Sequence, residues 1–507
     1  MRIVQSLWSG SKNLLTNNFG WHSPQYHVMA WTLSCLRLKE YYKDLYLYTD
    51  THGYNILIDY LKLPYKGVEV CYDTINHYHE SLWALPKIMT YASQEESFIH
   101  VDGDVFIWER FPEHLEAGDL IAQNIERGTD YYKQMMTHLE KDLKYIPDFL
   151  IDNLKKESIT SYNAGILGGS DITFIKEYTK EAIKFINHNQ REGFNPSINF
   201  NILFEQILFA SLTGSEEKKV TTLFSETFKD SGYSSSRFAD FSAVPFNLKY
   251  LHIIGTKKRE QEICELLSRI LLKEYPDFFY KIVSLFRHEH VNFEKKISFF
   301  LTRTYETSNV PVPAHKNESL CKSDQLDTIN KCSYSNSKEV NSFADTLKEL
   351  KQKWGDIKNQ KLLDGELAAT DFYSYFYLKK EQQAETLVQK NCYLEILEES
   401  FGWDKAVKEA INPDLLGDEV ENFGLAYVPR LFFEGYKEVV ISELDYNILI
   451  LLEEPHCIND IVLYLEKCFP PGKGKSNYDI IYNLTLHHLK KLFIHQCIYV
   501  KHPTEQI

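Results

Sequence analysis

The sequence has few of the features that mark secreted, membrane-spanning or redox proteins. Its nine cysteines are scattered and none forms a CxxC pair, which excludes the zinc clamps and redox pairs of that spacing. No stretch approaches ~18 uncharged apolar residues, and the first apolar run is too short for a signal peptide. The sequence therefore predicts a cytoplasmic protein with free thiols and no membrane span.

Positive charge is also scarce. The formal net charge is −15, from 71 acidic and 56 basic residues. Because nonspecific nucleic-acid binding comes from clustered Lys and Arg, we expect no nucleic-acid partner. Aromatic residues are abundant, with 33 Tyr and 31 Phe. They suit stacking on a sugar or a base, although core packing accounts for most of them.

The length of 507 residues exceeds the ~250 to 300 residues at which a single core usually stops growing, so several domains are expected. Residues 308–342 are rich in Ser, Asn, Lys and Pro and have few large apolar side chains, which is typical of a linker. The predicted organisation is a domain over 1–307, a linker over 308–342, a mostly helical region over 343–425, and a small domain over 426–507.

The first 110 residues alternate short apolar runs with helical patterns. Strands are predicted near 3–8, 45–49, 68–71 and 98–101, which indicates a mostly parallel sheet covered by helices on both faces and places the domain in the α/β class. Ligands of such sheets bind at the carboxyl ends of the strands. The charged residues from about 125 to 161 are expected to form a helical insertion that acts as a lid or faces an acceptor.

Two carboxylates, Asp102 and Asp104, flank Gly103 directly after the apolar run 98–101. Side-chain oxygens are the ligands that Mg²⁺ and Mn²⁺ accept, and such an ion can neutralise a diphosphate leaving group. An isolated Asp-x-Asp is more often chance or a capping turn. Its position at the end of a hydrophobic strand favours a metal site.

A second candidate lies in residues 251–258. His252, at a strand end, is suited to complete the shell of a metal, Gly255 allows close approach of a phosphate, and Lys258 supplies a point charge. The alternative is a core histidine beside solvated lysines. Further isolated candidates, each unremarkable alone, are Lys87, the run Asn163, Ala164 and Gly165, and the pair Glu205 and Gln206.

In this order along the chain, these elements resemble those of the glycogenin-like retaining glycosyltransferases, family 8 of the GT-A fold. The resemblance covers residues 1 to about 305 and implies a Rossmann-like, nucleotide-sugar-binding sheet. It departs from the family at Glu205, where the family has Asp, and in the insertion before Asn163. These departures leave the donor sugar and the acceptor open.

The resemblance also implies roles for individual residues. It assigns Mn²⁺ or Mg²⁺ to Asp102, Asp104 and His252. It assigns the diphosphate to Gly255 and Lys258. Residues that it places at the donor sugar or in catalysis are Lys87, Asn163, Ala164, Gly165, Glu205 and Gln206. Residues 45–50 resemble the family's base-binding strand more loosely, so Tyr48 could stack on a uracil or belong to the core, with Asp50 beside it.

Residues 426–507 show a different pattern. Two strands joined at Glu434-Gly435 precede helices predicted over 445–452, 458–468 and 478–492 and a strand over 494–500, which is typical of a winged-helix domain. The pattern resembles the recognition element of ribosomally made, modified peptide pathways, a module related to the pyrroloquinoline quinone D protein. That resemblance implies capture of a leader or precursor peptide as an added strand. A docking or dimerisation domain is the alternative, and the acidic charge disfavours DNA.

The sequence thus predicts a metal-dependent glycosyltransferase that moves a sugar from a nucleotide-diphosphate sugar, with UDP as the expected nucleotide, to an acceptor such as a ribosomally made peptide. Retention of configuration follows from the resemblance alone. The alternatives are a noncatalytic nucleotide-binding scaffold, a nucleotidyltransferase or nucleotide-sugar hydrolase, and a transferase acting on carbohydrate or lipid acceptors.

Overall fold

The structure is a computed structural model of the whole chain. It describes the following residues: 1–128, 132, 135, 143–190, 198–229, 238–286, 337–355, 375–376, 378–397, 423–429, 436–468 and 478–501. The chain divides into two compact units, Met1–Phe286 and Arg287–Ile507.

The first unit is built on an eight-stranded mixed sheet, with the order β3-β2-β1-β4-β7-β6-β8 and β9 also paired with β6. The first four strands run parallel, and β7 is antiparallel to both β4 and β6. The strands are β1 (Arg2–Leu7), β2 (Leu45–Thr49), β3 (Gly67–Val70), β4 (Phe98–Val101), β6 (Leu120–Arg127), β7 (Thr160–Gly169), β8 (Val220–Thr222) and β9 (Thr227–Phe228). The predicted α/β class is confirmed.

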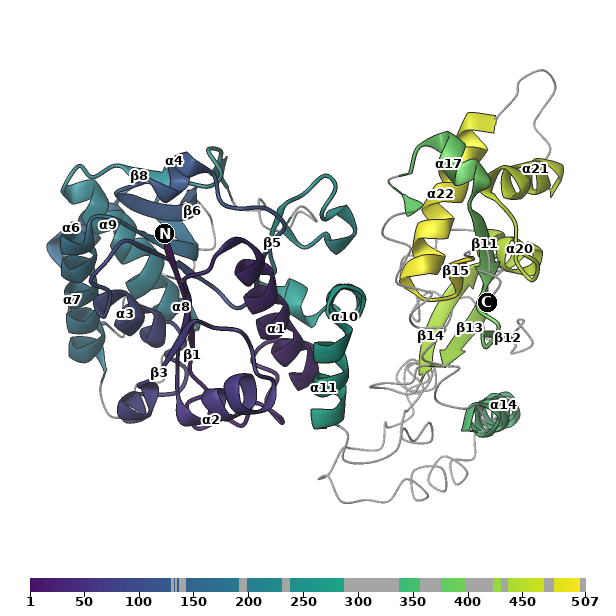
Figure 1. Ribbon diagram of the computed structural model, residues 1–507, viewed down its shortest axis with the longest axis horizontal. Helices are drawn as coiled ribbons and strands as arrows, with labels where there is room; N and C mark the ends of the chain where they lie inside the picture. The colour runs from purple at the N-terminus through teal and green to yellow at the C-terminus, as the bar shows by residue number, and fades with distance from the viewer. Residues whose placement is uncertain are drawn as a thin grey trace. The chain divides into compact units, whose positions relative to one another are not determined.

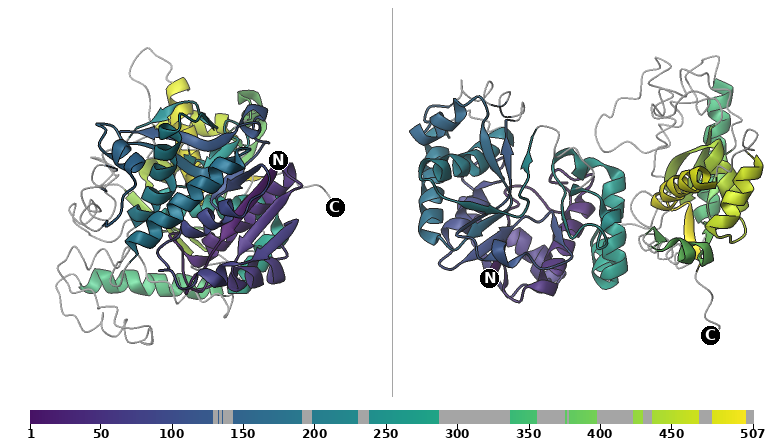
Figure 2. Two further views of the ribbon diagram at one scale, coloured as in Figure 1. Left: turned by 90° about the vertical axis from the view of Figure 1, so that its left-hand side faces the viewer. Right: turned by 90° about the horizontal axis from the view of Figure 1, so that it is seen from above.

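Helices cover both faces of this sheet (Figure 1). On one face, α1 (Pro24–Tyr41) packs against α10 (Gln261–Glu274) and α11 (Pro276–Phe286). The helices on the other face are α3 (Leu85–Ala92), α6 (Asp148–Leu154), α7 (Ile172–Asn189), α8 (Ile198–Ile202) and α9 (Leu208–Ser215). The turned views in Figure 2 show the same layering.

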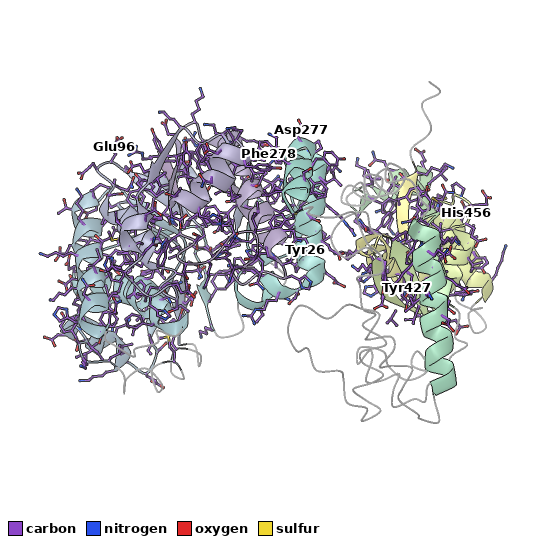
Figure 3. All side chains as sticks on the ribbon, turned by 90° about the horizontal axis from the view of Figure 1, so that it is seen from below. Tyr26, Glu96, Asp277, Phe278, Tyr427 and His456 are labelled. Carbon is purple, nitrogen blue, oxygen red and sulfur yellow. The ribbon has the colours of Figure 1, made fainter. Side chains whose placement is uncertain are left out.

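The burial pattern follows from these layers. All four residues of the central strand β4 are buried, because neighbouring strands flank it and helices cover it. Helix α1 is buried without interruption from Tyr26 to Leu38, as expected for a helix that lies between a sheet and two further helices. Figure 3 shows the side chains that fill this layer, with Tyr26 on α1 and Phe278 on α11 labelled.

A second, two-stranded sheet crosses the carboxyl end of β4. Strand β5 (Val105–Ile107) pairs antiparallel with β10 (Tyr250–His252), so that His252 lies opposite Val105. The backbone continues this pairing, since the amide of Ile253 donates to the carbonyl of Asp104 at 3.1 Å. The ladder therefore brings His252 next to the Asp-x-Asp turn.

The charged segment 125–161 differs from the prediction. Its two ends are the strands β6 and β7, which pair with each other, and between them the described residues contain α6 and the helical residues Tyr132 and Met135. Lys133 and Lys141 lie outside the described residues. The helical expectation is wrong at the ends because pairing between distant strands outweighs local charged composition. Farther along the chain, the described part of residues 260–305 forms α10 and α11, and residues 287–305 lie outside the described residues.

The described part of the second unit contains two small sheets. Strands β12 (Glu395–Leu397), β13 (Phe423–Pro429) and β14 (Tyr436–Ser442) form an antiparallel sheet, while β11 (Leu387–Lys390) pairs with β15 (Ile498–Lys501). Its helices are α14 (Ser337–Gly355), α17 (Lys380–Glu385), α20 (Glu443–Leu451), α21 (Ile458–Cys468) and α22 (Tyr478–Ile494).

The strands and helices of the second unit agree in part with the sequence prediction. The two hairpin strands and the three helices that follow are confirmed, whereas the turn at Glu434-Gly435 lies outside the described residues. Helix α22 continues to Ile494, so the last strand begins at Ile498 rather than near 494. Helix α14 starts at Ser337, inside the expected linker, and the region expected to be mostly helical also contains β11 and β12.

Among the described residues, none of the helices combines the length and apolarity that crossing a bilayer requires.

Candidate metal and nucleotide-sugar site

The Asp-x-Asp turn joins β4 to β5. The amide of Val105 donates to the carbonyl of Asp102 at 3.1 Å, which closes the turn. A side chain at Gly103 would lie 2.4 Å from the ring of Trp31 on α1, so only glycine allows the indole to pack on this backbone. The indole of Trp31 donates in turn to Nε2 of His27 at 3.0 Å. The turn therefore rests on a rigid aromatic support.

Asp102, Asp104 and His252 converge at this turn. One ligand atom from each lies within 4.8 Å of the others, and Nε2 of His252 is 3.5 Å from Oδ1 of Asp104. Two carboxylates and an imidazole suit Mn²⁺, and the imidazole makes the set less suited to Mg²⁺, which prefers oxygen. The three residues therefore could hold a divalent metal ion.

Two lysines hold the acidic side chains. Nζ of Lys87 on α3 is 2.8 Å from Oδ1 of Asp102 and 2.8 Å from Oε1 of Glu205. Nζ of Lys258 forms an ion pair with Oδ2 of Asp104. Glu205 is fully buried and also accepts from the hydroxyl of Tyr91 at 3.4 Å. Buried charges of this kind require such pairing to be tolerated.

Burial and neighbouring charges shift the ionisation of these groups. Burial raises the pKa of Asp102 to about 7 against the opposing effect of Lys87. Burial would also raise the pKa of Asp104, but the charges of Lys258 and His252 outweigh it and lower that pKa. Burial lowers the pKa of His252 to about 4. The imidazole is therefore neutral near pH 7, which is the form that binds a metal.

Strand β7 lies against this cluster through Asn163, Ala164 and Gly165. The carbonyl of Ala164 accepts from Lys87 at 3.4 Å, and the carbonyl of Gly165 accepts from the amide of Asp102 at 3.0 Å. Oδ1 of Asn163 accepts from the amide of Gly165 at 2.9 Å. A side chain at Gly165 would lie 2.4 Å from the ring of His252. The structure thus places Gly165 directly beside the predicted metal ligand.

The remaining predicted residues lie around this centre. Gly255 adopts a positive φ of 58° at the start of the exposed 3₁₀ turn Gly255–Arg259, which also carries Lys258. The ring of Trp21 lies 5.9 Å from Nζ of Lys258. Gln206 is half-buried beside Glu205.

Tyr48 and Asp50 lie at the carboxyl end of β2. Tyr48 is 4% exposed and belongs to the core cluster, which favours the packing role that the sequence left open. Asp50 is 2% exposed and accepts from the amide and hydroxyl of Ser9 at 2.6 and 2.7 Å and from the amide of Gly53 at 2.7 Å. Asp50 therefore anchors the loop after β1 rather than joining the carboxylate cluster.

Residues 1–285 match the family of unknown function DUF6734. The chain belongs to the DUF6734 family. The match ends one residue before the end of the first compact unit, Met1–Phe286, so the DUF6734 region and that unit coincide. The DUF6734 region contains every residue of the candidate site, whereas the second unit, Arg287–Ile507, lies beyond this region. No curated protein matches the chain.

Two residues of the DUF6734 region that the sequence analysis missed contact the site. Oε1 of Gln123 on β6 lies 2.6 Å from Nδ1 of His252 and accepts from the hydroxyl of Tyr250 at 2.7 Å. No local pattern marks Gln123, because its role depends on the pairing of β6 with β7 and on the position of β10. The alternation within residues 250–252 could have indicated that Tyr250 and His252 share one side of their strand.

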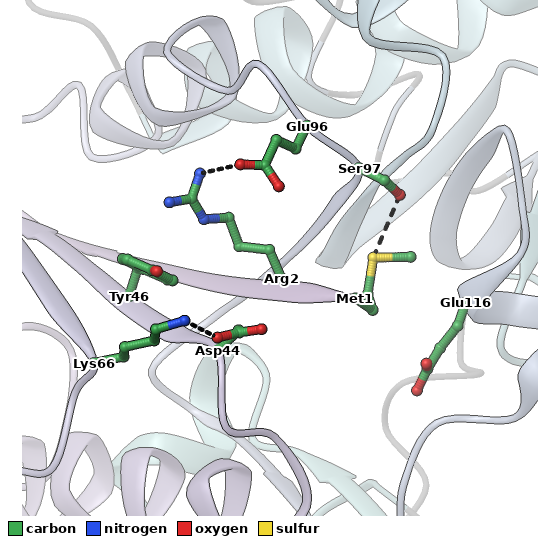
Figure 4. A pocket seen from close by; sticks show the side chains of 8 residues that line it. All are labelled: Met1, Arg2, Asp44, Tyr46, Lys66, Glu96, Ser97 and Glu116. Atoms are coloured by element: carbon green, nitrogen blue, oxygen red, sulfur yellow. Dashed lines mark hydrogen bonds and ion pairs between the residues drawn. The ribbon is translucent and has the colours of Figure 1, made fainter.

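A cavity of about 450 Å³ in the DUF6734 region lies elsewhere (Figure 4). Its walls come from the amino ends of β1 and β2 and the segment before β4, with Arg2, Tyr46 and Ser97 among the lining residues. Asp102 lies at the opposite, carboxyl end of β4. This cavity is therefore separate from the candidate site.

Proposed function

We propose that residues 1–286 form a GT-A glycosyltransferase that binds a nucleotide-diphosphate sugar, with a UDP-sugar as the first candidate, through a divalent cation. The observation that carries this proposal is the convergence of Asp102, Asp104 and His252 at the carboxyl end of a central parallel strand. Nucleotides bind at that edge of open α/β sheets. The DUF6734 match adds no activity of its own to the argument.

The local charge explains why a cation is needed. Asp102, Asp104 and Glu205 bring three carboxylates, against the two ammonium groups of Lys87 and Lys258. Metal binding requires the ionised form of Asp102. With all five groups ionised, a diphosphate without the metal ion would meet a site with one excess negative charge. A bound divalent ion supplies the positive charge that stabilises the departing nucleoside diphosphate.

The chain's own residues then have distinct tasks. Lys258 is half-buried on an exposed turn, so its ammonium group can leave Asp104 and bind a phosphate oxygen. Lys87 is almost completely buried between Asp102 and Glu205, and it holds these two carboxylates in fixed positions. Gln206 and Asn163 are the groups that we assign to the donor sugar, and we expect transfer with retention, as in the similar family.

We further propose that the second unit presents a peptide or protein acceptor. The antiparallel hairpin of β13 and β14 supports this proposal, because a peptide can bind to a sheet of this kind as an added strand. Glycosylation of a carbohydrate or lipid acceptor, and a noncatalytic scaffold, are the competing outcomes. Mass spectrometry of peptide, oligosaccharide and lipid acceptors, each incubated with the preferred donor, distinguishes them.

The donor site is tested by screening UDP-, GDP- and CMP-sugars with and without Mn²⁺. The full chain should show Mn²⁺-dependent thermal stabilisation by one nucleotide class and slow release of that nucleotide. Asp104→Asn should lose the stabilisation and reduce turnover by about a hundredfold or more, because a metal ligand contributes several kcal/mol to the transition state.

Asp44→Asn is the matched control, since Asp44 lines the cavity at the opposite end of the sheet and pairs with Lys66. It should leave donor binding and turnover unchanged. If no donor stabilises the full chain in the presence of Mn²⁺, the transferase proposal fails. If a donor is hydrolysed but no acceptor class ever gains a sugar, a nucleotide-sugar hydrolase replaces it.

A further inference from the structure

The side chain of Gln123 contacts the ring nitrogen of His252 that does not face Asp104. Gln123 is completely buried on β6, and its Oε1 lies 2.6 Å from Nδ1 of His252. The same oxygen accepts from the hydroxyl of Tyr250 at 2.7 Å. Nε2 of the imidazole lies on the side of the carboxylates, 3.5 Å from Asp104. The imidazole is thus held between an amide and the predicted metal site.

A chain of hydrogen bonds fixes which way this amide is oriented. Nδ2 of Asn124 donates to the carbonyl of Ile125 at 3.4 Å, and a carbonyl can only accept. The oxygen of the Asn124 amide therefore faces Gln123, whose Nε2 donates to it at 3.0 Å. With its nitrogen committed in this way, Gln123 presents its oxygen to Tyr250 and His252.

We propose that Gln123 is a positioning residue of the metal centre that fixes the tautomer of His252. An amide oxygen only accepts, so Nδ1 of His252 must carry the ring proton. The lone pair then resides on Nε2, the nitrogen that faces Asp104 and Asp102. The inference rests on the proposed function only in naming the metal as the group that this lone pair binds.

Strand β7 and Tyr250 restrict the positions that the side chains of Gln123 and His252 can adopt. A side chain at Gly165 would lie 2.4 Å from both Oε1 of Gln123 and the ring of His252, so β7 closes the space beside this pair. The phenol of Tyr250 occupies a second position at the same oxygen. If the acceptor is lost, Nδ1–H is left buried without its bond, and the tautomer with a proton on Nε2 becomes accessible. In that tautomer Nε2, the nitrogen on the side of the carboxylates, cannot ligate a metal.

The first test reads the tautomer on the metal-free full chain by ¹⁵N NMR of labelled histidine, with the His252 signals assigned from a His252→Gln variant. The unchanged chain and Gln123→Glu, which keeps an accepting oxygen, should show a proton on Nδ1. Gln123→Met and Gln123→Asn, which remove or withdraw that oxygen, should show the other tautomer or a mixture. Retention of the Nδ1–H tautomer in both of these variants overturns the proposal.

The second test measures the affinity for Mn²⁺ alone by electron paramagnetic resonance. Gln123→Met and Gln123→Asn should bind Mn²⁺ about 10- to 100-fold more weakly, as is typical when a ligand loses its supporting group, while Gln123→Glu stays close to the unchanged chain. Tyr250→Phe is the control, because it removes a neighbouring bond but keeps the acceptor for His252. Unaltered Mn²⁺ affinity in both Gln123→Met and Gln123→Asn also overturns the proposal.

The two tests distinguish a failure of the proposed metal site from a failure of the proposed role of Gln123. If the unchanged chain binds no Mn²⁺, or if Asp104→Asn binds it equally well, the metal site of the proposed function fails. The NMR result then still decides whether Gln123 sets the tautomer of His252, because that measurement needs no metal.

Discussion

The two ends of the same parallel strands differ in how they carry charge. At the amino end, Arg2 and Lys66 lie near Asp44 and Glu96 around an open cavity, and the Lys66–Asp44 pair is half exposed on both sides. At the carboxyl end, Lys87 lies between two carboxylates with 8% of its side chain exposed. The cavity lies at the first end, and the tighter concentration of opposed charge lies at the second.

The cavity of about 450 Å³ therefore does not coincide with the cluster of buried charge. Exposed ion pairs contribute little to stability, because water screens them and long side chains lose freedom in forming them. A buried cluster of carboxylates and lysines is costly to desolvate, so it requires a compensating structure around it. Perturbed ionisation of this kind is enriched at functional sites. The following predictions test whether the contrast holds.

The largest effect is expected from Lys87→Met. The substitution leaves Asp102 and Glu205 buried without their cation and should lower the free energy of unfolding by about 3–5 kcal/mol. Denaturant unfolding followed by tryptophan fluorescence measures this, because five of the seven tryptophans lie in the first unit. The matched change at the other end, Lys66→Met, should have no measurable effect. Equal losses in the two variants would contradict the contrast.

Gly165→Ala should have the next largest effect. The added methyl group would lie 2.4 Å from the His252–Gln123 pair and should destabilise the first unit by up to about 3 kcal/mol through overpacking. Gly214→Ala on α9 is its control, because nothing lies within 4 Å of a side chain there. That change should stabilise the helix by about 0.5–1 kcal/mol. Opposite signs in the two thermal unfolding shifts would bear out the crowding at Gly165, and a shared sign would refute it.

The second unit also contains a buried carboxylate, Asp445, which can be compared with the buried carboxylates around Lys87. Asp445 is fully buried at the start of α20 and is bound by Nδ1 of His488 at 2.7 Å and by Lys491. Burial alone would raise its pKa, but His488 and Lys491 outweigh burial and lower the pKa to about 2. It also completes a capping box with Ser442. Its contacts therefore serve the fold, and buried charge alone does not identify a site.

The pH dependence of unfolding tests this interpretation. Because the pKa of Asp445 is lower in the folded than in the unfolded chain, its carboxylate stabilises the fold above pH about 4. That contribution, about 2 kcal/mol, is lost as the pH falls from about 4 toward 2. Calorimetric unfolding of Asp445→Asn between pH 2 and 5 should lack this part of the slope. A variant that keeps the full slope would assign the acid sensitivity to other carboxylates.

The sequence predicted the parts of the molecule that depend on local pattern. The uniformly apolar run before Asp102 indicated a buried strand, and the position of His252 indicated a strand end. It could not predict β6, because the end of that strand, at Glu126 and Arg127, shares the charged composition of the segment that follows. Gln123 was missed for a different reason, because its partners are defined by strand pairing over long distances in the chain.

The β5–β10 ladder has a consequence for how the protein is made. Asp104 is synthesised long before His252, and the strands β6 and β7 and the helices α7 to α9 emerge from the ribosome between them. A growing chain that ends before residue 252 lacks one of the three candidate ligands, whatever else has folded. Ion capture would then be a late event in biosynthesis, so that a metal would stabilise finished chains over truncated ones.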